Sequence, residues 1–417
     1  MFRFNLNSNA LVITFFYIKI KISMKKVMKY TRILDNIIPK KNNKICFLVA
    51  YNHTNACLAY YNYLIKNHKN DYDYTIIINT PEAPHENNLK IQNLYPYTSF
   101  IGIFRAITSK YVVCTHCNFL LDIFNSDKHI YLHFNHGMPI KKVGLTRNVY
   151  DQDLKRQCKL LGEKANLFVT SDIFKLITIA CYKANYNNVH ITGTPRNDLI
   201  ASTVNDDKLK KYFEFDKYAK TILYMPTWKN NSEGTDAQVN MSYNNIFYLN
   251  DFDEKDFIKT IEENNILFIM KPHPISENFY KQNCNVLPKS QNFKIVYNDY
   301  FYSNQIEHYE LFKFIDLMIS DYSSAPLDYL ILNRPVAYLN NLADDYNKTR
   351  GIILEDNYEI LMPGIKILTY NNLKSQLIDI LNGDSYKEER EKLLPIIHKY
   401  RDFNTCERIY QIMKTLK

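Results

Sequence analysis

The sequence predicts an α/β protein made of two parallel-sheet domains in series. Its 417 residues exceed the size of one ordinary domain, so two domains are expected. Short apolar runs alternate with amphipathic stretches from about residue 44 onward, and the alternation restarts after a polar, charged stretch at residues 201–219. Strands alternating with helices are typical of parallel sheets with crossover helices. Two facing domains of this Rossmann-like kind place a cleft at the carboxyl ends of both sheets.

Each predicted strand is a short apolar run of the kind that forms a buried strand. Strands are expected at residues 44–51, 74–78, 111–114, 129–134, 167–170 and 188–192 in the first half, and at 221–225, 267–270, 293–297, 317–320 and 335–338 in the second. Helices are expected at residues 55–66, 254–264, 326–332 and from 373 to the end.

The chain divides into four predicted parts. These are an uncertain N-terminal segment at 1–39, Rossmann-like domains at 40–205 and 206–375, and a helical tail at 376–417. Residues 10–18 form an apolar run of nine residues, whereas a spanning helix needs about 20. Because Met24 offers a second start, residues 1–23 are interpreted either as a miscalled start or as a weak interfacial anchor.

Charge and cysteine content narrow the class of protein. The net charge of +9 suits an anionic partner such as nucleic acid, lipid headgroups or a polyphosphate substrate, although a Lys-rich genome explains it equally well. Eight scattered cysteines in a long chain indicate free thiols in a reducing compartment. Cys114 and Cys117 form a CxxC, but no second ligand pair lies at zinc-site spacing, so incidental thiols are favoured.

The first of four segments with candidate chemistry is NHGMPIKKVG at residues 135–144, after a predicted strand. His136 is a suitable proton acceptor near neutral pH. Gly137 either lets the backbone approach a ligand or adopts positive φ, and Lys141 and Lys142 add charge for phosphate. The alternative is a strand-capping histidine in an ordinary turn.

The second and third segments also follow predicted strands. In GTPRND, Arg196 is placed to bind a phosphate or carboxylate, and Asn197 or Asp198 to cap the next helix. The third combines MPTWK, which holds the only tryptophan, Trp228, with KPHP, where two prolines fix the backbone around His273. The alternatives are a structural turn, a core tryptophan and a surface histidine.

The fourth segment, SDYSSAPLDY at residues 320–329, has the strongest signal. An apolar strand leads into a turn with Asp321, Ser323 and Ser324, and Pro326 marks the first turn of a helix. Free amides at a helix start, together with two hydroxyls, favour an anion such as pyrophosphate. Simple N-capping by Ser or Asp is the alternative.

Taken in order, these segments resemble the CDP-glycerol glycerophosphotransferase family, which comprises bacterial teichoic-acid and capsule polymerases and primases. The family's blocks appear here as NHGMPIKK, GTPRND, PTWK, KPHP, SDYSS, then Arg350-Gly351 and Pro363-Gly364, between about residues 110 and 370. No single block is decisive, whereas six in order are highly specific.

The resemblance implies a GT-B-type fold, with two Rossmann-like domains facing a cleft and C-terminal helices. By position, His136 resembles the catalytic base and His273 the histidine at the donor phosphates; both are the predicted catalytic residues. The predicted donor-binding residues are Gly137, Arg196, Thr227, Asp321, Ser323, Ser324 and Arg350. We expect no cofactor and no obligatory protein-bound metal, because no convincing acidic metal pair is present.

The predicted reaction moves glycerol phosphate, or a related alditol phosphate, from a CDP-alditol to a hydroxyl of a surface polymer or its lipid-linked precursor, releasing CMP. The resemblance also implies a peripheral protein at the cytoplasmic face of the bacterial membrane, with no nucleic-acid partner. A GT-B glycosyltransferase using a nucleotide sugar is the second hypothesis, and a non-catalytic polymer-binding or membrane-binding protein the third.

Four positions depart from the family pattern. Asn135 replaces a tryptophan, Met138 a threonine, Thr194 an aromatic residue and Lys229 an arginine. The ammonium group of Lys229 cannot form the paired hydrogen bonds that an arginine guanidinium makes to a carboxylate or phosphate. Because two of the four changes lie in the first block, they bear on the acceptor and the alditol more than on the CDP donor.

Overall fold

The computed structural model describes residues 2–6, 10–15, 18–49, 55–78, 93–97, 99–115, 126–135, 137–147, 152–227, 245–340 and 351–416. The chain begins with an antiparallel sheet of β1 (Phe2–Leu6), β2 (Ala10–Phe15) and β3 (Ile18–Ser23). Helix α1 (Met24–Ile37) follows directly. The apolar run at residues 10–18 therefore contributes to two strands.

The first half is built on a parallel sheet of seven strands in the order β10-β9-β8-β7-β4-β5-β6. Its strands are β4 (Lys41–Val49), β5 (Asp73–Ile78), β6 (Leu94–Pro96), β7 (Ser109–Cys114), β8 (Ile130–His133), β9 (Ala165–Val169) and β10 (Val189–Ile191). The run Ile45 to Val49 is buried throughout, as expected of a central strand covered on both faces.

The second half has a parallel sheet of six strands in the order β13-β12-β11-β14-β15-β16. Its strands are β11 (Lys220–Met225), β12 (Ile266–Met270), β13 (Phe293–Ile295), β14 (Leu317–Ser320), β15 (Val336–Leu339) and β16 (Ile365–Ile367). One cluster of buried side chains runs from the first sheet into the second, including Leu167 and Val169 on one side and Leu223 and Leu267 on the other.

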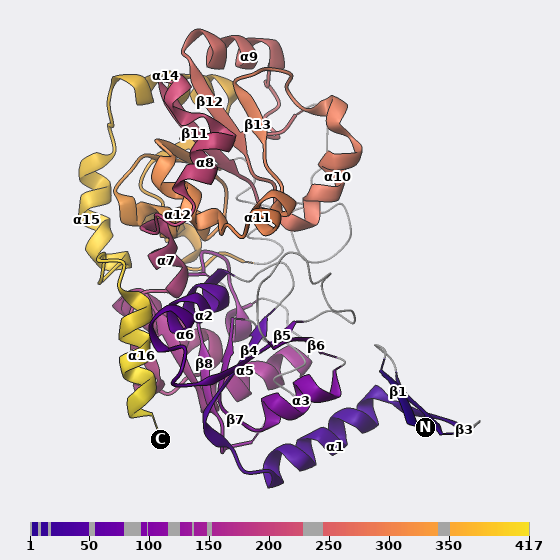
Figure 1. The fold of residues 1–417 in the computed structure, drawn as a ribbon. Coiled ribbons are helices and arrows are strands. Elements are labelled where there is room, and N and C mark those ends of the chain that lie inside the picture. Colours follow the sequence, from indigo (N-terminus) through magenta and orange to yellow (C-terminus); the bar gives the residue numbers. More distant parts are fainter. Residues whose placement is uncertain are drawn as a thin grey trace.

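Helices cover the sheets (Figure 1). In the first half they are α2 (Asn55–His68), α3 (Phe100–Ile107), α5 (Gln152–Lys164), α6 (Asp172–Tyr182) and α7 (Pro195–Ile200). After them come α8 (Asp206–Phe213), α9 (Glu254–Glu263), α10 (Glu277–Gln282), α11 (Asn298–Asn304), α12 (Ala325–Tyr329), α14 (Tyr370–Asn382), α15 (Lys387–Ile397) and α16 (Thr405–Thr415).

The C-terminal helices return the chain to the first half. Figure 1 shows α15 and α16 along one side, with α16 against the first half. Cys406, Ile409, Tyr410 and Met413 of α16 are buried in the same cluster as the side chains of α2 and β4. The predicted tail from residue 376 thus includes a helix that completes the first domain's core.

Every strand predicted from residue 44 onward lies on an observed strand, usually within one or two residues. The α/β class and its two parallel sheets are confirmed. The short strands β6 and β16 and the N-terminal sheet were not predicted. The predicted division of the chain into four parts remains a prediction.

Candidate functional site

The candidate segments all follow the carboxyl ends of parallel strands. The chain leaves β8, β10, β11, β12 and β14 immediately before residues 135, 193, 226, 271 and 321 respectively. In parallel α/β sheets these ends form the ligand-binding edge. These strand ends belong to two sheets, one in each half of the chain. Contacts that cross between the halves bring the two edges together.

Gly137 lies where the first segment meets the second half. Its φ is +141°, so the predicted positive φ is present. A Cβ on Gly137 would lie 2.2 Å from Ser324 Oγ and 2.9 Å from an Arg196 guanidinium nitrogen. Three of the predicted blocks therefore meet at one glycine. His136, the predicted base, lies outside the described residues.

The first segment continues into a backbone pairing with the second half. Lys141 forms an antiparallel bridge with Ile352, Ile353 N–H donates to Ile140 O at 2.7 Å, and Lys142 N–H donates to Gly351 O at 2.9 Å. The KK and RG blocks are thus joined by main-chain hydrogen bonds. Arg350, a predicted donor-binding residue, lies outside the described residues.

Two departures from the family pattern have structural roles. Asn135 is buried, adopts φ +56° and donates from Nδ2 to Phe168 O at 3.1 Å. Met138 is 1% exposed and belongs to the continuous core. Both side chains point into the protein, so these changes alter the support of the loop and not a polar group facing a ligand.

Arg196 occupies a different setting from the one expected. It is buried, and its guanidinium pairs with Asp328 Oδ2 at 2.8 Å. Burial alone would lower the pKa of Arg196, but the Asp328 carboxylate and Tyr309 shift it upward overall. An ion pair that joins the halves was not predicted, because Asp328 lies 132 positions further along the sequence. Whether Arg196 binds the donor remains a prediction.

The helix-capping prediction for GTPRND was wrong. The side chain of Asp198 caps α16 instead of the next helix, accepting from Thr405 N–H at 2.9 Å and Cys406 N–H at 2.7 Å. Thr194 is the N-cap residue of α7, and its side chain makes no capping hydrogen bond there. Sequence proximity suggested α7, whereas the return of α16 across the first sheet supplied the closer free amides.

Asp321 fixes the turn after β11. Its carboxylate accepts from Thr227 N–H at 3.0 and 3.1 Å and from the Thr227 hydroxyl at 2.8 Å. Asp321 is 1% exposed, so these bonds satisfy a buried charge. The PT and SDYSS blocks, 94 positions apart, are thereby held in one arrangement. Trp228 and Lys229, which follow Thr227, lie outside the described residues.

The two serines of SDYSS are half-buried at the start of α12. Ser323 Oγ accepts from Ala325 N–H at 3.2 Å. Ser324 is the N-cap residue, but its side chain makes no capping hydrogen bond. Helix α12 has five residues and continues directly into a 3-10 turn at Leu330–Leu332, so helical structure covers the predicted range 326–332. Simple capping accounts for Ser323 and leaves the hydroxyl of Ser324 for another role.

The KPHP turn places two ionisable groups at the end of β12. His273 is half-buried and its Nδ1 accepts from Ile275 N–H at 3.3 Å, so the predicted rigid turn is present. Lys271 is 4% exposed, and burial lowers the pKa of its ammonium group to about 8, opposed by Glu277 and Glu307. Lys271 was not among the site residues predicted from the sequence. Its position directly after a buried strand was the signal that could have identified it.

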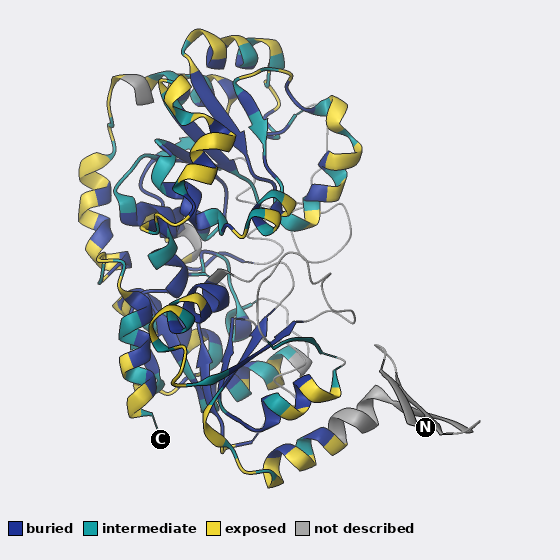
Figure 2. Cartoon of the chain, viewed as in Figure 1, coloured by how far each residue is buried: buried dark blue, intermediate teal, exposed yellow. Residues whose placement is uncertain are grey.

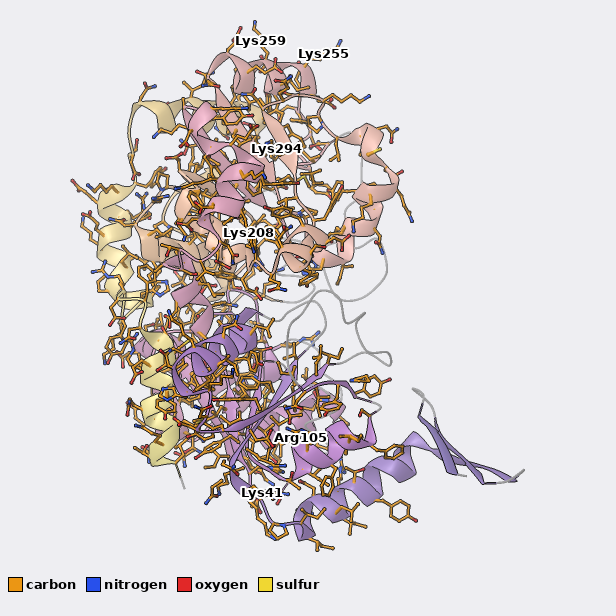
Figure 3. All side chains as sticks on the ribbon, in the orientation of Figure 1. Lys41, Arg105, Lys208, Lys255, Lys259 and Lys294 are labelled. Carbon is orange, nitrogen blue, oxygen red and sulfur yellow. The ribbon has the colours of Figure 1, made fainter. Side chains whose placement is uncertain are left out.

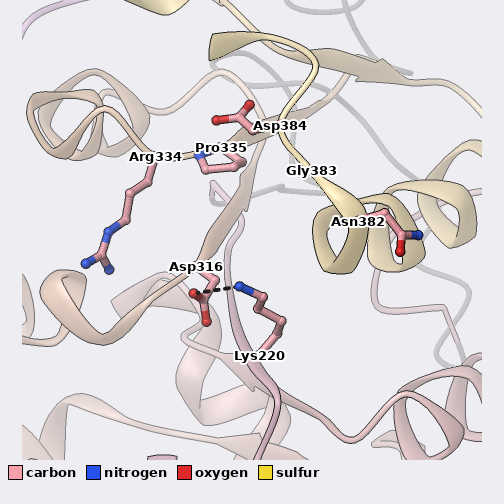
Figure 4. A pocket seen from close by; sticks show the side chains of 7 residues that line it. All are labelled: Lys220, Asp316, Arg334, Pro335, Asn382, Gly383 and Asp384. Carbon is pink, nitrogen blue, oxygen red and sulfur yellow. Dashed lines mark ion pairs between the residues drawn. The ribbon is translucent and has the colours of Figure 1, made fainter.

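A cavity of about 500 Å³ lies at the opposite edge of the second sheet (Figure 4). Lys220, Asp316 and Pro335 line it at the amino ends of β11, β14 and β15. Its charges are already satisfied: Lys220 pairs with Asp316 at 3.6 Å, and Arg334 donates to two backbone carbonyls at 2.6 Å. This cavity is therefore not part of the candidate site.

Metal ligands do not cluster in the described part of the chain, where no group of three or more His, Cys, Asp or Glu side chains is placed to hold an ion. Cys114 of the CxxC is buried, and burial raises the pKa of its thiol to about 12. Cys117 lies outside the described residues.

Comparison with known proteins gives the family. Residues 31–414 match the model for CDP-glycerol:poly(glycerophosphate) glycerophosphotransferases. The chain belongs to this family. It is 23% identical over 396 residues to the teichoic acid glycerol-phosphate primase of Bacillus subtilis strain 168, covering 90% of this chain and 93% of that protein.

A second relative is longer than this chain. The teichoic acid ribitol-phosphate polymerase TarL of Staphylococcus aureus is 29% identical over 229 residues, which are 53% of this chain and 36% of TarL. The chain thus matches about a third of that protein's length. A solved structure of the wall teichoic acid polymerase TagF, soaked with CDPG, superposes with a TM-score of 0.74 at 19% identity over 94% of this chain and 93% of that one. The predicted GT-B-type fold is confirmed.

Proposed function

We propose that this protein transfers glycerol phosphate, or a related alditol phosphate, from a CDP-alditol to a hydroxyl of a cell-surface polymer or its lipid-linked precursor, releasing CMP. One observation carries the proposal. Three of the family's sequence blocks, between residues 137 and 324, meet where Gly137 of the first half lies against Ser324 of the second and beside Arg196. Family membership gives that meeting point its chemistry.

The second half is proposed to bind the donor. Ser323 and Ser324 present hydroxyls at a turn, and Thr227 is held beside them by Asp321. Hydroxyl and amide donors suit the oxygens of a pyrophosphate. His273 adds a histidine with a fixed backbone from the neighbouring strand end. Asp321 is proposed to act by fixing Thr227, because its carboxylate is buried and already accepts three hydrogen bonds.

The proposed reaction is a substitution at phosphorus. The acceptor hydroxyl oxygen forms a bond to the phosphorus that carries the alditol, and the bond from that phosphorus to the oxygen of CMP breaks. His136 accepts the hydroxyl proton as general base. His273 and the serine turn stabilise the negative charge that builds on the phosphate oxygens and the departing CMP.

The identity of the alditol is proposed at the level of its class. The relatives include a glycerol-phosphate primase and a ribitol-phosphate polymerase, so the likeness supports either unit. A nucleotide-sugar glycosyltransferase remains the competing hypothesis, because the same fold would serve it.

Release of CMP tests the proposal. Purified protein with CDP-glycerol or CDP-ribitol and a lipid-linked acceptor should release CMP, and His136→Ala should lose at least about tenfold in rate, the lower range for a general base. His68→Ala, at a part-buried histidine that ends α2 and stacks on Tyr410, is the histidine control and should turn over normally. CMP release unchanged in His136→Ala would refute the base assignment. Turnover of a UDP-sugar alone would refute the reaction.

We further propose that the protein works at the cytoplasmic face of the membrane as a peripheral protein. Among the described residues, no helix has the length and apolarity needed to span a bilayer. The supporting observation is the orientation of α1. Thr31 and Asp35 are buried against the protein, whereas the large apolar side chains Ile33 and Ile37 are exposed. This helix packs with its polar side inward, opposite to a usual surface helix.

Buried charges hold α1 in that orientation. Asp35 Oδ1 accepts from Lys40 Nζ at 2.8 Å and from His129 Nε2 at 2.7 Å, and Oδ2 accepts from Ser126 N–H at 2.9 Å. Lys40 Nζ also donates to Ile107 O at 2.6 Å, which joins the end of α1 to the end of α3. The apolar side of α1 therefore cannot turn inward without breaking this network.

We propose that exposed apolar side chains of helices α1 and α3 form one surface, which we call the α1–α3 face. It consists of Tyr30, Ile33, Leu34, Ile37, Phe100, Ile101 and Phe104, all exposed (Figure 2). Helix α1 carries four basic residues, and its one acidic residue, Asp35, is buried. Lys41 lies at the same end of the molecule, whereas Arg105, also at this end, pairs with Asp73 (Figure 3). Apolar side chains flanked by basic ones suit the surface of an anionic bilayer.

Sedimentation with vesicles tests this surface. The protein should bind phosphatidylglycerol-containing vesicles, and Ile33→Ser, Ile37→Ser and Phe104→Ser together should weaken binding at least tenfold. The matched control replaces three exposed apolar residues elsewhere, Leu176, Val204 and Ile360, by Ser. Equal binding by both triple variants would refute the proposal. A dimer that only the first triple variant loses would assign the face to a second copy instead.

A further inference from the structure

A buried ion pair links the two halves directly beneath the candidate site. Arg196 is the second residue of α7 in the first half, and Asp328 lies in α12 of the second. Their side chains are 4% and 0% exposed. Low dielectric and the exclusion of water make such a pair sensitive to the position of both partners.

Both partners connect to the residues that face each other at the site. The Arg196 guanidinium would lie 2.9 Å from a Cβ on Gly137, so it supports the backbone of the first segment. Asp328 follows Ser324 by one helical turn, and its N–H donates to Ser324 O at 3.4 Å. A shift of the ion pair would therefore move the Gly137 loop and the serine turn relative to each other.

Neighbouring groups hold Asp328 in place from within the second half. The Tyr309 hydroxyl donates to Asp328 Oδ2 at 2.8 Å, and the Tyr309 ring lies 5.3 Å from the Arg196 guanidinium carbon. His398 Nε2 bonds with Leu327 O at 2.6 Å, one residue before Asp328. Arg196 and Tyr309, from segments far apart in the sequence, thus converge on one carboxylate, and His398 holds the residue before it.

We propose that Arg196 is a positioning residue that acts through Asp328, with Tyr309 as a third member of the unit. The ion pair sets the spacing between the Gly137 loop, which directly follows His136 in the chain, and the serine turn proposed to bind the donor. This inference rests on the proposed function, because it assigns Arg196, Asp328 and Tyr309 to the step in which the acceptor hydroxyl and the donor phosphate must meet. It differs from the sequence-based prediction that Arg196 binds the donor itself.

The spacing role predicts a specific kinetic result. Loss of the pair should lower kcat while the donor still binds, because the donor residues all lie in the second half. A misplacement of about 1 Å can cost on the order of 100-fold in rate. We expect Arg196→Met and Asp328→Asn each to lower kcat about 10-fold to 100-fold, with the CDP-glycerol dissociation constant within twofold of wild type. The double variant should be no slower than the slower single variant, because the residues act as one unit.

The experiment combines calorimetric binding of CDP-glycerol with CMP release for wild type, both single variants and the double variant. Lys313→Met, which removes a partly exposed ion pair with Asp206, is the matched control and should leave kcat unchanged. Tyr309→Phe keeps both charges and removes one hydroxyl, so it serves if the charge variants fail to fold; a several-fold loss of kcat is expected.

Three results would overturn the inference. A donor dissociation constant raised tenfold in Arg196→Met but not in Asp328→Asn would make Arg196 a donor ligand. Losses of kcat that multiply in the double variant would show independent roles. Unchanged kcat in Arg196→Met would rule out the positioning role. If Tyr309→Phe is the only variant that folds, unchanged kcat in Tyr309→Phe would rule it out. If wild type turns over no CDP-alditol, the proposed function fails separately, and urea denaturation then tests the pair: the losses of unfolding free energy in Arg196→Met and Asp328→Asn should not add in the double variant, and additive losses would overturn it.

Discussion

Replacing Gly137 by Ala should separate the two halves at the candidate site. The new Cβ would lie 2.2 Å from Ser324 Oγ, 2.8 Å from Ser324 Cβ and 2.9 Å from an Arg196 nitrogen. The serine hydroxyl can rotate away, but the Cβ–Cβ contact requires backbone movement. The φ of +141° adds a second penalty, because side chains other than glycine rarely adopt it.

The magnitude follows from these two effects. An unfavourable φ costs on the order of 1–3 kcal/mol, and overpacking costs roughly 1–3 kcal/mol. We therefore expect Gly137→Ala to lose about 2–6 kcal/mol of unfolding free energy in urea denaturation. A loop shifted by about 1 Å should also lower the rate of CMP release about 100-fold.

Two further variants isolate the cause. Gly383→Ala is the matched control, because nothing lies within 4 Å of its Cβ and its backbone is extended at φ 163°. Its stability should stay within about 0.5 kcal/mol of wild type, as for other surface changes. Combining Gly137→Ala with Ser324→Gly removes both serine contacts and should restore part of the lost stability. Stability and CMP release both unchanged in Gly137→Ala would refute the close approach.

Three other predictions concern buried ionisable groups. Asp321→Asn should weaken the bonds to Thr227 and cost roughly 1.5–3 kcal/mol, the range for hydrogen bonds to a charged group, measured by urea denaturation; an unchanged midpoint would contradict it. Burial lowers the pKa of Lys271 to about 8 in the folded protein, whereas the unfolded chain keeps this proton to higher pH. The free energy of unfolding should therefore rise by about 3 kcal/mol between about pH 8 and 10.5. Lys271→Met should flatten this rise. Burial lowers the pKa of His133 to about 4, so the free energy of unfolding should fall as the pH drops from 6.5 toward 4. In His133→Asn the free energy of unfolding should depend less on pH over this range.

The sequence was sufficient for features that depend on local pattern. The run KICFLV predicted a buried strand, and β4 spans it with its apolar residues buried. The strand-to-turn transitions before Gly137 and Asp321 were likewise visible, since each apolar run ends at a cluster of Gly, Ser or Asp. Because the carboxyl ends of parallel strands lie at the same edge of a sheet, these local signals also predicted that the segments line a cleft between the carboxyl edges of the two sheets.

Features that depend on long-range pairing were not visible. Arg196 appeared available for a phosphate, yet Asp328 neutralises it across the halves. Asp198 appeared to cap its own helix, yet α16 lies against it. The run at residues 10–18 was interpreted as part of a miscalled start or of a weak anchor, yet it contributes to the paired strands β2 and β3. Each of these depends on which element packs beside another, and periodicity within one element carries no such information.

Binding of a nucleotide panel tests the central claim most directly. CDP-glycerol, CDP-ribitol and several UDP-sugars are each added to the purified protein, and the thermal midpoint is recorded; a ligand that binds the native state raises it through linkage. We predict that CDP-alditols raise the midpoint and that this shift is lost when Ser323 and Ser324 are both replaced by Ala. A shift with a UDP-sugar and none with either CDP-alditol would contradict the account.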